Sequence, residues 1–442
     1  MKIHPIINKI INVLRLKEIN TTSLSNNANR LTLSSLGMSN HTGIYPHSNN
    51  RTLQAPAYEI IRFRNPVSAL KPIHKSHFQQ KTHKVKTIHI AIFGIGNVGG
   101  TLIDQVLASI VDIEEKKHIR LKIFAIANSS RLLLDKNGMD TDWHEKFNSE
   151  GRPYEVQNVV DFARFHHLDN LIAIDNTASA QFVQNYLQLV QQGFHLISSN
   201  KIGNTMSYDF YQELRHILKK HHRDYLYETN VGAGLPLIDT IKLLHLSGEK
   251  ITAIKGVFSG SLSYLFNTYS ISDRPFSSIL TAAIDHGYTE PDPREDLSGN
   301  DVARKLLILA RELDLKSELS EINILNLIPE AMRPLSTIEF MHHIEEVNFH
   351  FKKQKDELLP GEVLRYIGEI TGDIQNGKSQ LKTDLVKVSA SSPLGQLSGS
   401  DSLFEIYTES YGTNPIIIRG AGAGAAVTAR GVFGDILRIA TK

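Results

Sequence analysis

Residues 89–100, HIAIFGIGNVGG, decide the fold of this chain. The run from His89 to Phe93 is short and apolar, as in a buried strand, and apolar residues recur at helical spacing after Gly100. A strand, a glycine-rich turn and a helix in this order predict a dinucleotide-binding unit, because the glycines let the backbone approach a pyrophosphate at the helix N-terminus. We expect the cofactor to contact Gly94, Ile95, Gly96, Asn97, Val98 and Gly99. An ordinary glycine-rich turn is the alternative.

The region that follows alternates between strands and helices. The predicted strands are Leu121–Ala127, Leu171–Asp175, His195–Ser198 and Tyr225–Tyr227, and the predicted helices are Ala180–Gln191 and Tyr208–His221. Such alternation predicts a mostly parallel, doubly wound sheet. Ligands collect at the carboxyl ends of such strands, where residues 128–131, 176–177 and 200–201 stand. Asn and Ser are also common turn residues, but Lys201 would serve no packing purpose there.

Residues 288–305, YTEPDPREDLSGNDVARK, place carboxylates and bases on one turn and one helix start. Two prolines disfavour helix just before them, so we expect Glu290 on a shaped loop. Asn300 is a good N-cap, and the helix that would begin there carries Asp301 and Lys305 four residues apart on one face. Such a pair can act on one small molecule. An ordinary ion pair at a helix start is the alternative.

The last part of the chain combines strand-like runs with a final helix. The predicted strands are Val363–Ile370, Leu381–Ser389, Leu403–Thr408 and Pro415–Arg419, and the predicted helix is Ala425–Ala440. A glycine-rich loop at 420–424 precedes this helix, and we expect the chain end to return to the dinucleotide-binding domain; a flexible linker is the alternative. The sequence therefore predicts an α/β fold, in which a Rossmann-type doubly wound parallel sheet is joined to a second, α+β domain.

Composition restricts the chemistry. The chain has 442 residues, 41% of them hydrophobic, and a net charge of +2, which permits more than one core and gives no argument for nucleic-acid binding. No apolar run approaches the roughly 18 residues of a membrane-spanning helix, so we expect no membrane partner. The chain has no cysteine, which excludes disulfides, thiolate metal sites and cysteine nucleophiles. Direct hydride transfer to or from a carbonyl remains open.

Residues 1–87 differ in composition from the rest. They are rich in Asn, Ser, His, Lys and Arg, and Glu18 and Glu59 are their only acidic residues. We expect a mobile basic tail with a short amphipathic helix at 6–16. An organellar transit peptide is the alternative. We therefore expect a cytoplasmic protein, or an organellar one if the tail is such a peptide.

Six stretches of this sequence resemble homoserine dehydrogenases, in that family's order. They are FGIGNVGG near residue 94, SSNKIGNT near 200, ETNVGAGLP near 228, GVFSGSLSYLFN near 256, the stretch at 288–305 and RGAGAGAAVTARGVFGDIL near 419. The resemblance covers roughly residues 88 to 442 and is strongest with the dehydrogenase half of bifunctional aspartokinase–homoserine dehydrogenases. It implies NAD(P)-dependent interconversion of L-aspartate 4-semialdehyde and L-homoserine in threonine, methionine and isoleucine biosynthesis.

The resemblance also implies roles for the charged residues. Hydride that arrives at the aldehyde carbon leaves an alkoxide, which needs a positioned ammonium; Lys305 is our first candidate for this catalytic role and Lys201 the second. Glu290 and Asp301 can hold the ammonium of the substrate as charge-assisted partners. Asp296 supports the site or touches the same ammonium.

The expected cofactor is NADP, with NAD as the alternative. Thr177, at the end of a predicted strand, is a candidate contact, and by resemblance Lys201 and Gly424 lie next to the cofactor. Rossmann domains that choose NAD place an acid at the end of the second strand, whereas no acid follows Ala127 until Asp135. Ser130 and Arg131 can instead bind a 2′-phosphate.

Metal and partner assignments rest on the resemblance alone. A sodium ion would be bound by Glu228 and the backbone of Val231, Ala233 and Leu235, and a hinge between domains is the alternative. The second domain contributes to dimerisation in the family, so we expect a homodimer that acts on a small-molecule substrate. The chain then divides into a tail at 1–87, a dinucleotide-binding domain at 88–227 completed by 420–442, and a substrate-binding and dimerisation domain at 228–419.

Two other classes of protein stay open. A Rossmann oxidoreductase for another amino-acid semialdehyde or hydroxy acid would leave the acidic stretch unexplained. A non-catalytic dinucleotide sensor would have no use for Asp301 and Lys305. Because the sequence outside 88–442 has no room for kinase and regulatory modules, we also expect no allosteric response to threonine.

Overall fold

A computed structural model describes residues 84–442 of the chain. The predicted tail therefore lies outside the described residues, apart from its end. Lys86 and Thr87 belong to the first strand, whereas the prediction placed them in the tail. No helix among residues 84–442 is long and apolar enough to cross a membrane.

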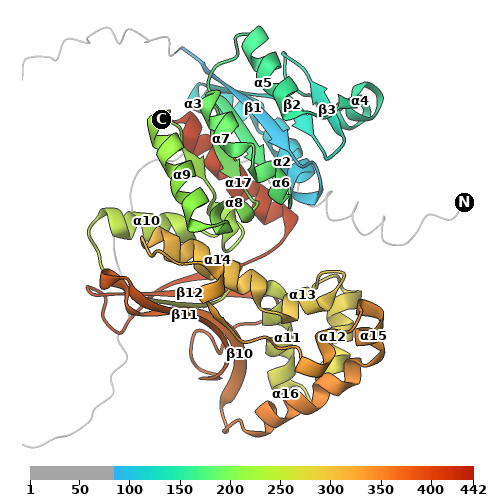
Figure 1. Cartoon of the computed structure of the whole chain (residues 1–442), viewed down its shortest axis with the longest axis vertical. Coiled ribbons are helices and arrows are strands. Elements are labelled where there is room, and N and C mark those ends of the chain that lie inside the picture. The colour runs from blue at the N-terminus through green and yellow to red at the C-terminus, as the bar shows by residue number, and fades with distance from the viewer. Residues whose placement is uncertain (1–83) are drawn as a thin grey trace, which may run out of the picture. The chain divides into compact units, whose positions relative to one another are not determined.

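The first sheet has seven strands in the order β4-β3-β2-β1-β5-β6-β7 (Figure 1). Its parallel strands are β1 (Lys86–Phe93), β2 (Ile119–Ala127), β5 (Leu171–Asp175), β6 (His195–Ser198) and β7 (Tyr225–Leu226). The short strands β3 (Arg131–Leu134) and β4 (Arg152–Pro153) pair antiparallel at one edge. The strand order reverses between β1 and β5, which is where dinucleotides bind in doubly wound sheets.

Strand β1 is buried on both faces because helices cover both sides of the sheet. Ile88, Ile90 and Ile92 share one core with helices on one side, whereas Ala91 and Phe93 belong to the core on the other side. The helices on the isoleucine side include α2 (Asn97–Leu107), α3 (Ile110–Lys117), α4 (Trp143–Glu150) and α17 (Ala425–Ala440). The opposite core includes α5 (Val156–Phe165), α6 (Ala180–Val183), α7 (Tyr186–Gln191) and α9 (Tyr208–Lys220).

The predicted helix at 180–191 is interrupted. It forms two short helices, α6 and α7, with Gln184 and Asn185 between them. The Asn185 side chain donates a hydrogen bond from Nδ2 to the carbonyl of Phe182, at 2.9 Å. Asparagine side chains compete in this way with the backbone bonds of a helix. The break is therefore local and leaves Phe182 and Tyr186 in the core.

The second sheet has six strands in the order β13-β12-β8-β10-β11-β9. The strands are β8 (Ile251–Val257), β9 (Asn323–Ile324), β10 (Glu362–Asp373), β11 (Lys378–Ser389), β12 (Asp401–Thr408) and β13 (Ile416–Ala421). All neighbours pair antiparallel except β9 and β11. The larger helices of this part are α10 (Leu237–Leu246), α11 (Gly260–Ile271), α12 (Phe276–Asp285), α14 (Asn300–Glu312), α15 (Thr337–His342) and α16 (Val347–Asp356).

The chain end crosses from the second sheet to the first. Strand β13 pairs with β12, whereas α17, drawn in red in Figure 1, packs against α2 and buries Val432, Phe433 and Ile436 in the isoleucine core. The predicted fold class, a Rossmann-type α/β fold plus a second domain, is confirmed. The domain boundaries stay predictions, because the described residues 84–442 all belong to one compact unit and Gly420 still lies in β13.

Candidate active site

Helix α14 presents Asp301 and Lys305 on one face, as the spacing predicts. The predicted N-cap is wrong: Asn300 is the first helical residue, and Gly299 precedes it with a φ of 75°. A side chain at 299 would also meet the hydroxyl of Tyr366, since an added Cβ would lie 2.1 Å from that oxygen. Glycine at 299 therefore fixes where the helix begins.

The carboxylate of Asp301 bridges two lysines. Lys305 Nζ lies 2.8 Å from Asp301 Oδ2, and Lys201 Nζ lies 3.3 Å from Asp301 Oδ1. Burial opposes charge on Asp301, but the two ammonium groups outweigh burial and hold its pKa below the ordinary value. The structure thus joins residues that the sequence analysis placed in separate motifs.

Lys305 is the more buried of the two lysines. Its Nζ also donates a hydrogen bond to the carbonyl of Phe258, at 2.7 Å, and only 8% of the residue is exposed. Burial lowers the pKa of the Lys305 ammonium, and the Asp301 carboxylate counters this effect. A buried lysine of lowered pKa is well suited to exchange a proton with a substrate.

Two further carboxylates stand beside this cluster. Asp296 Oδ1 accepts a hydrogen bond of 2.6 Å from the Ser261 hydroxyl, and Oδ2 accepts one of 2.9 Å from the backbone amide of Glu290. Burial, followed by the neighbouring carboxylates, raises the pKa of Glu290. Burial also raises the pKa of Asp296, against the hydrogen bond from Ser261. Both acids therefore favour a nearby cation.

A cavity of about 570 Å³ brings Lys201 together with the carboxylates, whereas Lys305 pairs with Asp301 and does not itself line the cavity. Among its lining residues are Thr177, Ser199, Asn200, Lys201, Ser259, Glu290, Asp296, Asp301 and Arg304. Arg304 and Ser259 were not among the predicted site residues. Both lie within sequence stretches that resemble the family, but no spacing pattern indicates that an arginine or a serine at these positions lines a cavity.

The glycine loop has the shape that the sequence predicts. Gly94 has a φ of 88°, and an added Cβ would lie 2.7 Å from the backbone of Asn176. An added Cβ at Gly99 would lie 1.9 Å from the carbonyl oxygen of Gly94, whereas Gly96 faces open space. No side chain caps the start of α2 at Gly96. Free amide groups beside open space suit the pyrophosphate of a dinucleotide.

The glycine loop continues into the lysine cluster through the ends of β5 and β6. Asp175, at the end of β5, accepts hydrogen bonds from Tyr186 Oη at 2.7 Å, from Asn200 Nδ2 at 3.0 Å and from the amide of Thr177 at 2.8 Å. Burial raises the pKa of Asp175, and these hydrogen bonds counter it. Asp175 and Tyr186 are missed by the sequence analysis, because an acid inside a strand and a tyrosine inside a helix carry no motif. They fix the two loops that carry Thr177 and Lys201.

Arg131 makes contacts that the sequence analysis did not foresee. Its Nη2 donates to the backbone carbonyls of Asn148 and Gly151, at 2.8 and 3.1 Å. The amides of Ser130 and Arg131 donate to Asn128 Oδ1, at 2.9 and 2.7 Å. The arginine therefore ties β3 to the end of α4, and its role toward a 2′-phosphate stays a prediction.

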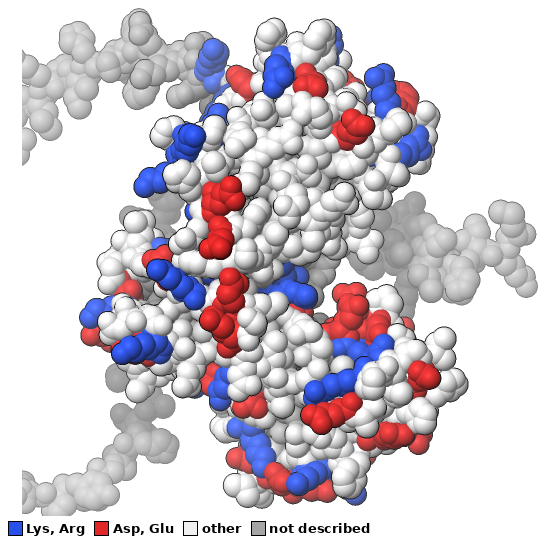
Figure 2. All heavy atoms as spheres, in the orientation of Figure 1, with Lys and Arg blue, Asp and Glu red and all other residues white. Residues whose placement is uncertain are grey.

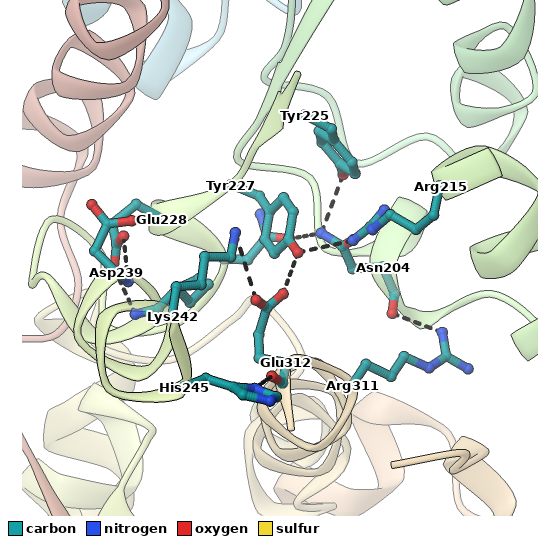
Figure 3. A network of polar contacts seen from close by, with 12 residues as sticks. Asn204, Arg215, Tyr225, Tyr227, Glu228, Asp239, Lys242, His245, Arg311 and Glu312 are labelled. Atoms are coloured by element: carbon teal, nitrogen blue, oxygen red, sulfur yellow. Dashed lines mark hydrogen bonds and ion pairs between the residues drawn. The ribbon is translucent and has the colours of Figure 1, made fainter. Parts of the chain in front are cut away.

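The predicted sodium ligands are mostly engaged with the protein itself. The carboxylate of Glu228 accepts hydrogen bonds from the amides of Ile238 and Asp239, at 2.7 and 3.0 Å, and Figure 3 shows Glu228 beside Asp239. The carbonyl of Leu235 accepts one from Leu237. Val231 and Ala233 are buried. Among residues 84–442, no three His, Cys, Asp or Glu side chains are arranged to hold a metal ion. The predicted site consists of one carboxylate and three backbone carbonyls, so the sodium ion and its ligands stay a prediction.

Gly424 has a φ of 121° and begins α17. The Gln105 side chain of α2 donates a hydrogen bond to the carbonyl of Ala426, at 3.1 Å, so the start of α17 is tied to the helix that follows the glycine loop. A direct contact of Gly424 with the cofactor stays a prediction.

On the face shown in Figure 2, acidic and basic side chains of the described residues are interspersed.

The fold and the site define a class of protein. A Rossmann sheet with a glycine loop at its switch point, next to a cavity lined by Lys201 and four carboxylates, one of which pairs with the buried Lys305, is an NAD(P)-dependent oxidoreductase architecture. Residues 94–228 match the family model described as homoserine dehydrogenase, NAD binding domain, and residues 236–437 match the one described as homoserine dehydrogenase. The chain belongs to the homoserine dehydrogenase family, and the resemblance seen in the sequence is confirmed.

Relatives of known name support this assignment. The chain is 37% identical over 385 residues to a chloroplastic bifunctional aspartokinase/homoserine dehydrogenase of Arabidopsis thaliana, covering 86% of this chain and 41% of the relative. It is 35% identical over 394 residues to the bifunctional enzyme of Haemophilus influenzae, covering 88% and 46%. The chain thus spans less than half the length of these curated relatives.

Solved structures show the same fold. A Candida auris protein of unknown function is 32% identical, with a TM-score of 0.72, over 81% of this chain and 99% of that one. A hyperthermophilic archaeal homoserine dehydrogenase in complex with NADPH is 20% identical, with a TM-score of 0.60, over 80% and 97%. At that identity the second likeness concerns the fold alone.

Proposed function

We propose that the protein is a homoserine dehydrogenase, which interconverts L-aspartate 4-semialdehyde and L-homoserine in the biosynthesis of threonine, methionine and isoleucine. The observation that carries the proposal is the Asp301 carboxylate between Lys201 and Lys305, in one cavity with Glu290 and Asp296. The chain's family membership gives the substrate, and the cavity supplies groups that match its charges.

The carboxylates account for the ammonium of homoserine. Glu290, Asp296 and Asp301 line one cavity, and partial loss of hydration together with the neighbouring acids raises the pKa of Glu290, which is exposed, and of Asp296, which is half-buried. A substrate ammonium would relieve this repulsion and form charge-assisted hydrogen bonds. An oxidoreductase for an uncharged or purely anionic alcohol would gain nothing from these acids.

The lysines account for the proton. When bound, the nicotinamide supplies or accepts the hydride. In the oxidation of homoserine, neutral Lys305 removes the hydroxyl proton, and in the reduction its ammonium returns that proton to the alkoxide. Lys201, on the other side of Asp301, stabilises the charge that develops on the oxygen. Asp301 orients both amino groups.

A substrate without the ammonium tests the proposal against its main alternative. 4-Hydroxybutanoate has the chain and hydroxyl of homoserine but no amino group. We expect kcat/KM for homoserine to exceed that for 4-hydroxybutanoate by ~10²-fold or more, since buried groups built to bond a substrate reject an analogue that lacks the partner. Equal values, or a preference for 4-hydroxybutanoate, would favour an oxidoreductase for hydroxy acids. A dinucleotide sensor would turn over neither.

The rate should depend on pH through Lys305. Because burial lowers the pKa of Lys305, the neutral amine forms below the ordinary pH for lysine, and homoserine oxidation should rise as pH increases through that pKa. Reduction of the semialdehyde needs the ammonium and should fall over the same range. Asp301→Asn removes the carboxylate that raises the pKa, so the profile should move to lower pH. A profile of kcat that the substitution leaves in place would contradict this assignment.

We further propose that the cofactor is NADP. No carboxylate follows β2 until Asp135, Ser130 and Arg131 stand at the end of that strand, and a structural relative is named as a complex with NADPH. We expect kcat/KM to be higher for NADP than for NAD, and Arg131→Lys, which keeps the charge and loses the bidentate fork, to reduce the ratio by ~10-fold.

A second variant, Arg131→Ala, removes the guanidinium altogether, and its effect also includes the loss of the structural contacts of Arg131. The substitution also removes the bonds to Asn148 and Gly151, so the ratio of NADP to NAD is the informative quantity and the absolute rate is not. Arg152→Ala, an exposed arginine on neighbouring β4, is the matched control. An NADP-to-NAD ratio that favours NAD in the wild type would defeat the assignment.

The remaining assignments are also proposals. We propose that the protein is a homodimer, which sedimentation at several protein concentrations tests directly. We keep the cytoplasm as the expected location, and an organelle as the alternative, since the curated plant relatives are chloroplastic. Sodium has no part in the proposed chemistry.

A further inference from the structure

Arg311 is a buried charge that the proposed chemistry does not use. It lies in the last turn of α14, the helix that carries Asp301 and Lys305, and only 2% of the residue is exposed. It does not line the candidate active-site cavity. Burial deprives a guanidinium of its hydration, and this loss is unfavourable unless hydrogen-bond partners in the protein offset it. The partners of Arg311 therefore indicate its role.

The guanidinium of Arg311 holds the end of α8 (Ile202–Thr205). Nη1 donates to the carbonyl of Asn204 at 2.9 Å and to the carbonyl of Met206 at 2.8 Å, and Figure 3 shows Arg311 reaching Asn204. From the other side, Nη2 contacts Glu318 Oε2 at 3.2 Å and donates to the carbonyl of Ser317 at 3.1 Å. Arg311 thus bonds Ser317 and Glu318 on one side and the backbone of α8 and Met206 on the other.

Helix α8 is the segment that carries Lys201. Lys201 is the residue directly before its first turn, and its Nζ lies 3.3 Å from Asp301 Oδ1 on α14. A helix of four residues has little stability of its own. The spacing between α8 and α14 therefore decides whether Lys201 reaches Asp301, and Arg311 is a direct bond between the two helices.

A second set of contacts holds the same residue of α8. The Asn204 side chain accepts a hydrogen bond of 2.9 Å from Arg215 Nη2, which also donates to the hydroxyl of Tyr227 at 2.8 Å. That hydroxyl donates to Glu312, the neighbour of Arg311 on α14. Figure 3 shows this network closing around Asn204. The end of α14 is therefore linked to α8 by two routes, of which only Arg311 bonds the α8 backbone.

We propose that Arg311 is a positioning residue, which acts through α8 to keep Lys201 at bonding distance from Asp301. The proposal rests on the proposed dehydrogenase function. Without the guanidinium, the carbonyls of Asn204 and Met206 lose their donor, and only the contacts of the Asn204 side chain still link α8 to the end of α14, so α8 can shift. Glu290 and Asp296 stand outside α8 and α14, and Asp301 stays on α14, so the substrate-binding carboxylates keep their places.

Arg311→Met and Arg311→Lys test the proposal in two backgrounds. In the wild type, Arg311→Met should lower kcat by ~10- to 100-fold, since small misplacements of catalytic groups have effects of this size. KM for homoserine should change by less than about 3-fold, and Arg311→Lys, which can still donate to a carbonyl, should recover part of kcat. In Lys201→Met, the same Arg311→Met change should lower kcat by less than about 3-fold, because the group that it positions is gone.

Arg333→Met is the matched control, because Arg333 also bonds a backbone carbonyl, that of Ile328 at 3.0 Å, but touches no residue of α8. It should leave kcat unchanged. An equal loss of kcat from Arg311→Met in both backgrounds, or a folded Arg311→Met with normal kcat, would overturn the proposal. If Arg311→Met does not fold, Arg311→Lys and Glu318→Gln replace it in both backgrounds. Each should lower kcat by a smaller factor, and again less in Lys201→Met than in the wild type.

Hydrogen–deuterium exchange separates this proposal from the proposed function. Exchange in residues 202–206 should rise in Arg311→Met, or in Arg311→Lys, and not in Arg333→Met, whatever the substrate is. A wild type that does not turn over homoserine would defeat the function alone. Unchanged exchange at 202–206 would defeat the role of Arg311 alone.

Discussion

Lys305→Ala should lower kcat for homoserine oxidation by ~10²- to 10⁴-fold, the range for loss of a general base. The reason is geometric: Lys305 Nζ is fixed by Asp301 at 2.8 Å and by the carbonyl of Phe258 at 2.7 Å, inside the helix face that borders the cavity. KM for the cofactor should change little, because the glycine loop lies on the first sheet. Steady-state kinetics of the purified variant provide the measurement.

The folding of this variant needs its own check. Asp301 keeps Lys201 as a partner after Lys305 is removed, so the unfolding temperature should fall only modestly. Lys305→Met preserves the buried stem of the side chain and should show the same loss of kcat with better stability. Lys255→Ala, at a half-exposed position in β8, is the control. Near-normal kcat in Lys305→Met would remove this residue from the mechanism and leave Lys201 as the candidate base.

Asp301→Asn should lower kcat/KM for homoserine by ~10²-fold or more. The substitution removes a carboxylate that pairs with two lysines and is also expected to bind the substrate ammonium, and hydrogen bonds to charged groups contribute about 1.5–3 kcal/mol each. Both kcat and KM should respond, because the residue serves the lysines as well as the substrate.

Asp292→Asn is the control for this change. Asp292 stands in the same acidic stretch, but it pairs with Arg294 and accepts a hydrogen bond from Thr337, and these contacts lower its pKa to about 2. It does not line the cavity, so the variant should retain kcat/KM within about 3-fold. If Asp292→Asn and Asp301→Asn lost activity equally, the acidic stretch would act through its fold and not through Asp301.

Most of the fold was predictable because its signals are local. Alternating apolar strands and amphipathic helices gave β2, β5, β6, β7, α9 and α17 at nearly their observed bounds. The interruption between α6 and α7 was not predictable, since it depends on one side-chain bond of Asn185 that competes with a regular helical pattern. The position of β13 in the second sheet also depends on pairing with β12, which the sequence of the strand alone does not encode.

The candidate site likewise contains some residues that have a local signal in the sequence and others that have none. Asp301 and Lys305 were recognisable as a pair because they are four residues apart on one helix. The contact of Asp301 with Lys201, 100 positions earlier, was not predicted, since the family resemblance placed Lys201 only beside cofactor and substrate, and the contact depends on how α8 meets α14. Asp175 and Arg311 have no local signal at all, because each acts through hydrogen bonds to segments that are distant in the sequence.

The central claim is that the cavity around Asp301 oxidises homoserine with a nicotinamide cofactor. The most direct measurement is to mix the purified protein with L-homoserine and NADP, to follow reduced nicotinamide by absorbance and to identify the carbon product by mass spectrometry. We expect equimolar formation of reduced cofactor and aspartate 4-semialdehyde, which Lys305→Met abolishes. A folded wild-type protein that binds the cofactor and yields neither product, or that yields them undiminished in Lys305→Met, would contradict this claim.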